Sequence, residues 1–108
     1  IFQWAALTSP FSGDELAIQQ GTELYQRFCQ HCHGEEGDGK GPVGVIFGGV
    51  PNYHTQRNIQ SMSKGEIYRT ITFGRGAMRS HRAQLDPEER WKIAEYIKAW
   101  QAEVAASK

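Results

Sequence analysis

Apolar side chains recur at helical spacing in three stretches of the chain. In the first stretch, Ser12 and Glu15 have the spacing of a capping box, and the apolar positions that follow predict a helix over about 13–30. The same capping signature at Ser63 predicts a shorter helix over about 63–73. No stretch shows a clear strand pattern, so the sequence indicates an all-α fold.

The last predicted helix has the clearest signals at its start. Asp86 is a favourable N-cap, Pro87 suits the first turn, and Glu89 completes a third capping box. The helix is predicted over about 87–105, with one apolar side formed by Ile93, Ile97, Trp100 and Val104.

The segment between His33 and Ser61 is rich in glycine and has no convincing period. A connection of this length is uncommon in a compact domain unless it wraps around something. Apolar residues make up only 39% of the chain, so a buried prosthetic group would supply apolar area that the side chains lack. We expect one domain over 12–108, with long loops wrapped around a cofactor, after an N-terminal arm or linker over 1–11.

The charge of the chain is balanced, with twelve basic and twelve acidic residues. No overall field therefore favours nucleic acid or an anionic membrane surface. No apolar run approaches the roughly 18 residues that a membrane span needs, and no signal peptide is recognisable at the start. We expect partners to bind through local patches, and any membrane tether to lie outside this chain.

Cys29, Cys32 and His33 form a Cys-x-x-Cys-His sequence at the end of the first predicted helix. Two thiols one helical turn apart can each form a thioether with a haem vinyl group, while the adjacent imidazole can ligate the iron. The spacing is the attachment signature of c-type haem, and we expect one covalently bound haem c.

A Cys-x-x-Cys pair also occurs in thioredoxin-like redox sites and in zinc sites. A redox pair is expected after a strand, and none is predicted here. Zinc fingers place their histidines three to five residues apart. His54 and His81 are isolated in this sequence, and His31 and His33 lie directly beside the cysteines. This spacing does not match a zinc finger, so the haem interpretation is preferred.

Met78 is the predicted second axial ligand, because it ends a glycine-rich loop that can bring a thioether to the iron. Met62 and His81 remain alternatives. A second strong ligand is typical of an electron carrier. No substrate pocket is indicated, so we predict a one-electron carrier and not an enzyme. The alternative is a gas- or peroxide-reactive haem protein with a labile sixth ligand.

Residues outside the motif resemble those of class I cytochromes c over about 12–105. In that family, a small and an aromatic residue of the N-terminal helix contact an aliphatic and an aromatic residue of the C-terminal helix. The matching positions are Gly21 and Tyr25 in the first helix, and Ile93 and Tyr96 in the last. The family also has a Gly-Pro pair whose proline carbonyl accepts the hydrogen bond of the proximal imidazole, and Gly41-Pro42 matches it. The resemblance implies a class I cytochrome c fold, with crossing terminal helices, a shorter middle helix and Pro42 orienting His33.

Further segments are similar to the monohaem cytochrome c subunit of bacterial alternative complex III, a quinol:electron-acceptor oxidoreductase; they are 37–44, 74–78 and 87–91, with Ser80-His81 and Gln84-Leu85. This resemblance implies a periplasmic location or the outer face of the bacterial cytoplasmic membrane. It implies a multihaem cytochrome or quinol-oxidising complex as electron donor, and a soluble cytochrome or terminal oxidase as acceptor. One departure is Arg79, because many class I members have proline after the methionine ligand.

Between Glu66 and Asp86 the chain has several arginines and no acidic residue. Three of them lie within four residues of Met78, and we call them the arginine patch: Arg75, Arg79 and Arg82. If Met78 ligates the iron, this patch borders the haem and predicts an acidic docking surface on a redox partner.

Overall fold

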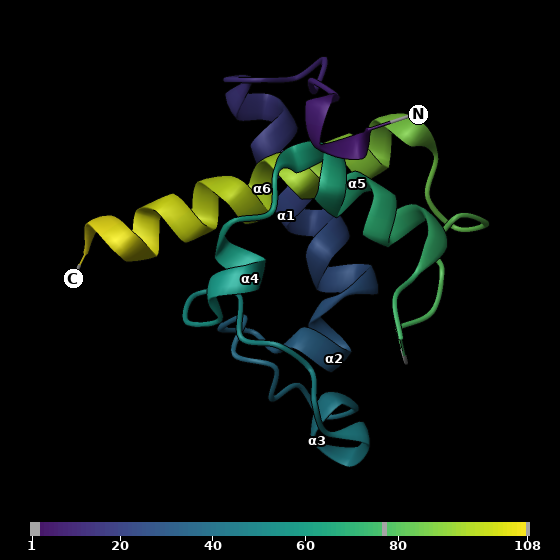
Figure 1. Ribbon diagram of the computed structural model, residues 1–108, viewed down its shortest axis with the longest axis vertical. Helices are drawn as coiled ribbons and strands as arrows, with labels where there is room; N and C mark the ends of the chain where they lie inside the picture. Colours follow the sequence, from purple (N-terminus) through teal and green to yellow (C-terminus); the bar gives the residue numbers. More distant parts are fainter. Residues whose placement is uncertain (1–2, 77, 108) are drawn as a thin grey trace.

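The computed structural model describes residues 3–76 and 78–107 (Figure 1). In this part of the chain all named elements are helical and none is a strand, which confirms the predicted all-α fold. No helix formed by these residues is both long enough and apolar enough to cross a membrane. In chain order the elements are η1 (Trp4–Ala6), α1 (Glu15–Phe28), α2 (Gln30–His33), α3 (Gly44–Phe47), α4 (Arg57–Gln60), α5 (Lys64–Phe73) and α6 (Pro87–Ala106).

Two of the predicted capping boxes are present. At the start of α5, the Ser63 hydroxyl accepts a hydrogen bond from the Glu66 N–H at 3.2 Å, and the Glu66 carboxylate accepts one from the Ser63 N–H at 2.9 Å. At the start of α6, Asp86 and Glu89 exchange the same two bonds at 2.8 and 2.9 Å. Each box satisfies backbone donors that would otherwise lack partners, so both helices begin where the sequence predicts.

The predicted cap of the first helix is wrong. The N-cap of α1 is Asp14, whose carboxylate accepts a hydrogen bond from the Ala17 N–H at 3.2 Å. The Ser12 hydroxyl instead donates to the Ser9 carbonyl at 3.3 Å. Asp14 has the extended backbone that an N-cap residue needs, with φ −86° and ψ 106°, and aspartate is as good a cap as serine.

Helices α1 and α6 contact each other at Gly21. A Cβ atom at this position would overlap the Lys92 carbonyl oxygen and lie 3.0 Å from the Cβ of Tyr96. The absence of a side chain therefore lets the two backbones approach. Figure 1 shows α6, drawn in yellow-green to yellow, running across α1, with α5 beside it. The buried core includes Tyr25, Ile67, Ile71, Leu85, Ile93, Ala94 and Ile97.

The described part of the N-terminal arm packs against α5. The Trp4 ring stacks on Tyr68 at a centroid distance of 6.2 Å and meets Phe73 edge-on at 5.7 Å. The Trp4 carbonyl oxygen lies where a Cβ on Gly65 would be, so the arm approaches the α5 backbone closely. The boundary between arm and domain after residue 11 stays a prediction.

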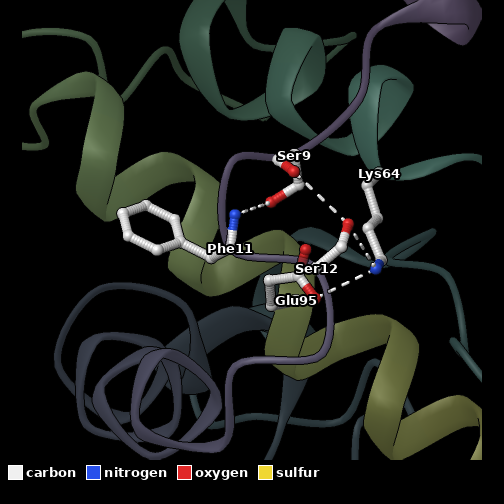
Figure 2. A network of polar contacts seen from close by, with 5 residues as sticks. All are labelled: Ser9, Phe11, Ser12, Lys64 and Glu95. Carbon is white, nitrogen blue, oxygen red and sulfur yellow. Dashed lines mark hydrogen bonds and ion pairs between the residues drawn. The ribbon is translucent and has the colours of Figure 1, made fainter.

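A polar network connects the arm to both α5 and α6 (Figure 2). The Lys64 ammonium lies 3.0 Å from a carboxylate oxygen of Glu95 and 3.5 Å from the Ser12 hydroxyl. Ser9 accepts from the Ser12 hydroxyl through its carbonyl and from the Phe11 N–H through its hydroxyl. The Glu95 side chain is 2% exposed and that of Lys64 31%, so a cation reaching in from the surface neutralises a buried carboxylate.

Candidate haem site

The Cys-x-x-Cys-His motif lies at the junction of α1 and α2. Cys29 ends α1, where its N–H donates to the Tyr25 carbonyl at 2.8 Å, and its own carbonyl accepts from the His33 N–H at 3.0 Å. These bonds continue the helical turn through the motif, so the two thiols and the imidazole are presented by one short stretch of helical backbone. Both cysteines are free; Cys29 is buried and Cys32 is partly exposed.

The environment of Cys29 does not suit a reactive redox thiol. Burial, followed by the neighbouring Cys32, raises the pKa of the Cys29 thiol to about 12. Redox-active cysteines depend instead on lowered pKa values that make the thiolate available near neutral pH. A structural role for this sulfur, such as a covalent bond to a cofactor, agrees better with its position in the core.

His33 is a buried, neutral imidazole. Its side chain is 8% exposed, and burial, helped by His31 and His81, lowers its pKa to about 4. The imidazole is therefore uncharged at neutral pH, which is the form that binds metals. Its Nδ1 atom is buried without a hydrogen-bond partner.

The segment after the motif folds back over it. The N–H of Gly41 donates to the Cys32 carbonyl at 3.2 Å, and that of Val43 donates to the His31 carbonyl at 2.8 Å. Pro42 therefore lies beside the motif. Because the Nδ1 atom of His33 has no partner, the structure does not contain the predicted hydrogen bond to the Pro42 carbonyl. The role assigned to Pro42 stays a prediction.

The predicted iron ligand Met78 closes a narrow turn. Its backbone N–H and carbonyl pair with those of Arg75 at 2.9 and 3.0 Å, and Gly74 enters the turn with a left-handed φ of 77°. The side chain of Met78 is partly buried. Ala77, within the turn, lies outside the described residues. Ligation of iron by Met78 stays a prediction.

The two alternative ligands lie in different surroundings. Met62 packs against the buried core that contains Cys29. It also lines a surface cavity of about 440 Å³ together with Asn58, Glu66, Arg69, Thr70 and Arg75. His81 is partly buried, its ring lies 6.5 Å from that of Phe28, and burial lowers its pKa.

The residues of a zinc site are not gathered. Across residues 3–76 and 78–107, no three histidine, cysteine, aspartate or glutamate side chains are grouped as a metal ion would need. His31 is exposed, and His54 packs edge-on against Trp100 at 4.8 Å. The histidines available to complete a Cys-x-x-Cys zinc site therefore do not converge on the cysteines.

The residues of the Cys-x-x-Cys-His motif fit a covalently held haem. Two free thiols and a neutral imidazole with an unpartnered ring nitrogen are carried by the same short stretch of helical backbone. Gly44, which begins α3, lies directly against the Cys32 carbonyl, and the next residues, Val45 and Ile46, expose 61% and 79% of their surface. Apolar side chains are therefore exposed at the surface close to Cys32, as the binding of a large apolar group would require.

A helical fold with this motif at the end of its first long helix defines the class of c-type cytochromes. A sequence profile of the family described as "Cytochrome C oxidase, cbb3-type, subunit III" matches residues 16–97, and the chain belongs to this family. Membership of this family implies a covalently bound c-type haem.

One curated relative is the "Cbb3-type cytochrome c oxidase subunit CcoP" of Azospirillum brasilense, which is 32% identical over 87 residues. The match covers 80% of this chain and 29% of the relative, so the chain spans less than a third of the length of that protein. The comparison supports the cytochrome class and gives no support to membership of alternative complex III.

The sequence did not reveal Tyr53 as part of the site. Its ring stacks on that of His33, with centroids 4.8 Å apart and planes 20° apart. The only available signal was an aromatic residue in a glycine-rich segment without periodicity, and such a residue can lie anywhere on a folded surface or core.

Proposed function

We propose that this chain is a one-electron carrier domain of a bacterial respiratory chain, with one haem c bound through Cys29 and Cys32. In this proposal His33 and Met78 are the axial ligands, and Pro42 supports His33. The main support for this proposal is the buried, uncharged imidazole of His33, which lies on the same stretch of helical backbone as two free thiols. When bound, the haem supplies the reversible one-electron change, and the chain holds it and sets its exposure and potential.

We propose a terminal oxidase assembly as the physiological context. The relative from Azospirillum brasilense is named as a subunit of such an oxidase, and the matched family is described in the same terms. A soluble cytochrome or a quinol-oxidising complex would supply the electron. These redox partners act on the outer side of the bacterial cytoplasmic membrane, and we place this domain there too. The alternative complex III assignment would need support from an isolated complex.

The arginine patch is the proposed docking surface. Its three members are exposed in the structure, and no acidic residue lies between Glu66 and Asp86 in the sequence. A positive surface orients an acidic partner before contact and raises the association rate in a manner that depends on salt.

Visible spectra of the purified protein in both oxidation states test the proposal. A pyridine haemochrome spectrum of c type, with colour retained after acidified-organic extraction, is expected for two thioether bonds. A colourless protein expressed together with a cytochrome c maturation system would contradict the haem proposal.

Substitution of the two methionines tests the sixth ligand. Met78→Ala should keep the haem attached, remove the oxidised-state sulfur-to-iron band and lower the reduction potential, because a thioether favours ferrous iron. Met62→Ala is the matched control and should keep both properties. The reverse result would assign the ligand to Met62.

A further inference from the structure

The face of the His33 imidazole is covered by Tyr53, a residue twenty positions further along the chain. The ring centroids are 4.8 Å apart and the planes are inclined by 20°, which is a stacked arrangement at close range. The Nδ1 atom of His33 has no hydrogen-bond partner in the structure, so this stack can limit the rotation of the ring independently of the support proposed for Pro42. The rings lie close enough for Tyr53 to oppose rotation of the imidazole out of the stacked orientation.

Tyr53 is itself held firmly. Its N–H donates to the Gly37 carbonyl at 2.9 Å, and its carbonyl accepts from the side-chain amide of Gln101 on α6 at 3.0 Å. Its ring also meets Tyr25 and Trp100 edge-on, each at a centroid distance of 6.2 Å. The two hydrogen bonds hold the Tyr53 backbone, and the edge-on contacts hold its ring; the residue as a whole leaves only 7% of its surface exposed.

We propose that Tyr53 is a positioning residue that fixes the plane of the His33 imidazole about its bond to the iron. The inference rests on the proposed function, because it takes His33 as the axial ligand. The orientation of an axial imidazole decides which iron orbitals its π electrons overlap, and contacts beyond the ligand set both that orientation and the reduction potential. Gln101 of α6 would contribute indirectly, because it holds the backbone from which the Tyr53 ring projects.

Paramagnetic proton NMR of the oxidised holoprotein tests this role, because the haem-methyl shifts depend on the direction of the axial imidazole plane. Tyr53→Leu removes the aromatic face but keeps an apolar side chain, and it should change the order or the spread of these shifts. Tyr53→Phe is the matched control. It keeps the ring and should reproduce the wild-type pattern.

A second variant keeps the test decisive if Tyr53→Leu does not fold. Gln101→Met removes the donor to the Tyr53 carbonyl with little change in volume, and it should shift the haem-methyl pattern in the same sense but less. Unchanged shifts in a folded Tyr53→Leu protein would overturn the inference. So would unchanged shifts in Gln101→Met when Tyr53→Leu does not fold, or a Tyr53→Phe pattern as altered as that of Tyr53→Leu.

Failure of the proposed function would be seen separately. It would appear in the wild-type protein as the absence of a c-type pyridine haemochrome, before any variant is compared. A haem-bearing wild type with insensitive Tyr53 variants would therefore refute only the positioning role.

Discussion

Replacing Gly21 by alanine tests the contact that joins the first and last helices. The new Cβ would overlap the Lys92 carbonyl oxygen, and it would also lie 2.7 Å from the Lys92 carbonyl carbon and 3.0 Å from the Cβ of Tyr96. The first two atoms belong to the backbone in the first half of α6, which spans Pro87–Ala106. They cannot rotate away as a flexible side chain could.

The expected free-energy change has two opposing parts. Alanine is favoured over glycine in a helix interior by about 1 kcal/mol. Overpacking a tight contact costs about 1–3 kcal/mol, and the upper end applies here because backbone atoms must move. The net effect of Gly21→Ala is a destabilisation of about 2 kcal/mol, which corresponds to roughly 8–16 °C in Tm for a domain of this size.

Denaturation of the oxidised holoprotein by guanidinium, followed by far-ultraviolet circular dichroism, measures this change. Gly65→Ala is the control, because a Cβ there would also overlap a backbone carbonyl oxygen, that of Trp4. Trp4 belongs to the N-terminal arm, which can shift without separating long helices, so Gly65→Ala should stay within about 1 kcal/mol of wild type. If Gly21→Ala is as stable as wild type or more stable, the close contact between α1 and α6 is refuted.

Substitutions at a helix cap, at the buried ion pair and at the arginine patch give three further predictions. Asp86→Ala removes the cap of α6 and should lower the free energy of unfolding by about 1 kcal/mol in urea, whereas no change would mean that the box is dispensable. Lys64→Met leaves the Glu95 carboxylate buried without its cation and should cost about 3 kcal/mol, the low end for a buried pair because Lys64 is partly exposed. Adding Glu95→Leu should recover at least half of that loss, and no recovery would show that the pair does not act as a unit. Reversing the arginine patch to glutamate should slow electron exchange with an acidic redox partner at low ionic strength, with the difference shrinking as salt rises; equal rates at low salt would place docking on another face.

The helices were predictable because their signals are local. A capping box needs only a side chain and an N–H three residues apart, so Ser63 and Asp86 could be identified without knowledge of the fold. The error at the first helix has the same origin. Both Ser12 and Asp14 are acceptable caps in the sequence, and only the backbone conformation around Asp14 decides between them.

The Cys-x-x-Cys-His motif was recognisable for a similar reason, since its spacing lies within five consecutive residues; the role of each residue in haem attachment stays a prediction. The surroundings of the motif were not predictable. Tyr53 and His33 are far apart in sequence, and their stacking depends on how the glycine-rich loop folds back and on a hydrogen bond from Gln101. The packing of Trp4 on α5 likewise joins segments with no shared local pattern.

Tyr25 shows why the helix contact and the attachment motif behave as one unit. It lies one helical turn after Gly21 on α1, and its ring packs against Tyr96 and Trp100 of α6 at centroid distances of 5.4 Å. Its hydroxyl donates a buried 2.6 Å hydrogen bond to the carbonyl of Gly34, the residue that follows the motif. Burial raises the pKa of this phenol far above its ordinary value, so the hydroxyl is protonated and acts as a donor at neutral pH. One side chain thus connects the two long helices to the turn that holds the His33 imidazole, the proposed iron ligand. A change that separates α1 from α6 must therefore also disturb that turn, and spectroscopic changes at the haem should accompany a loss of stability at Gly21.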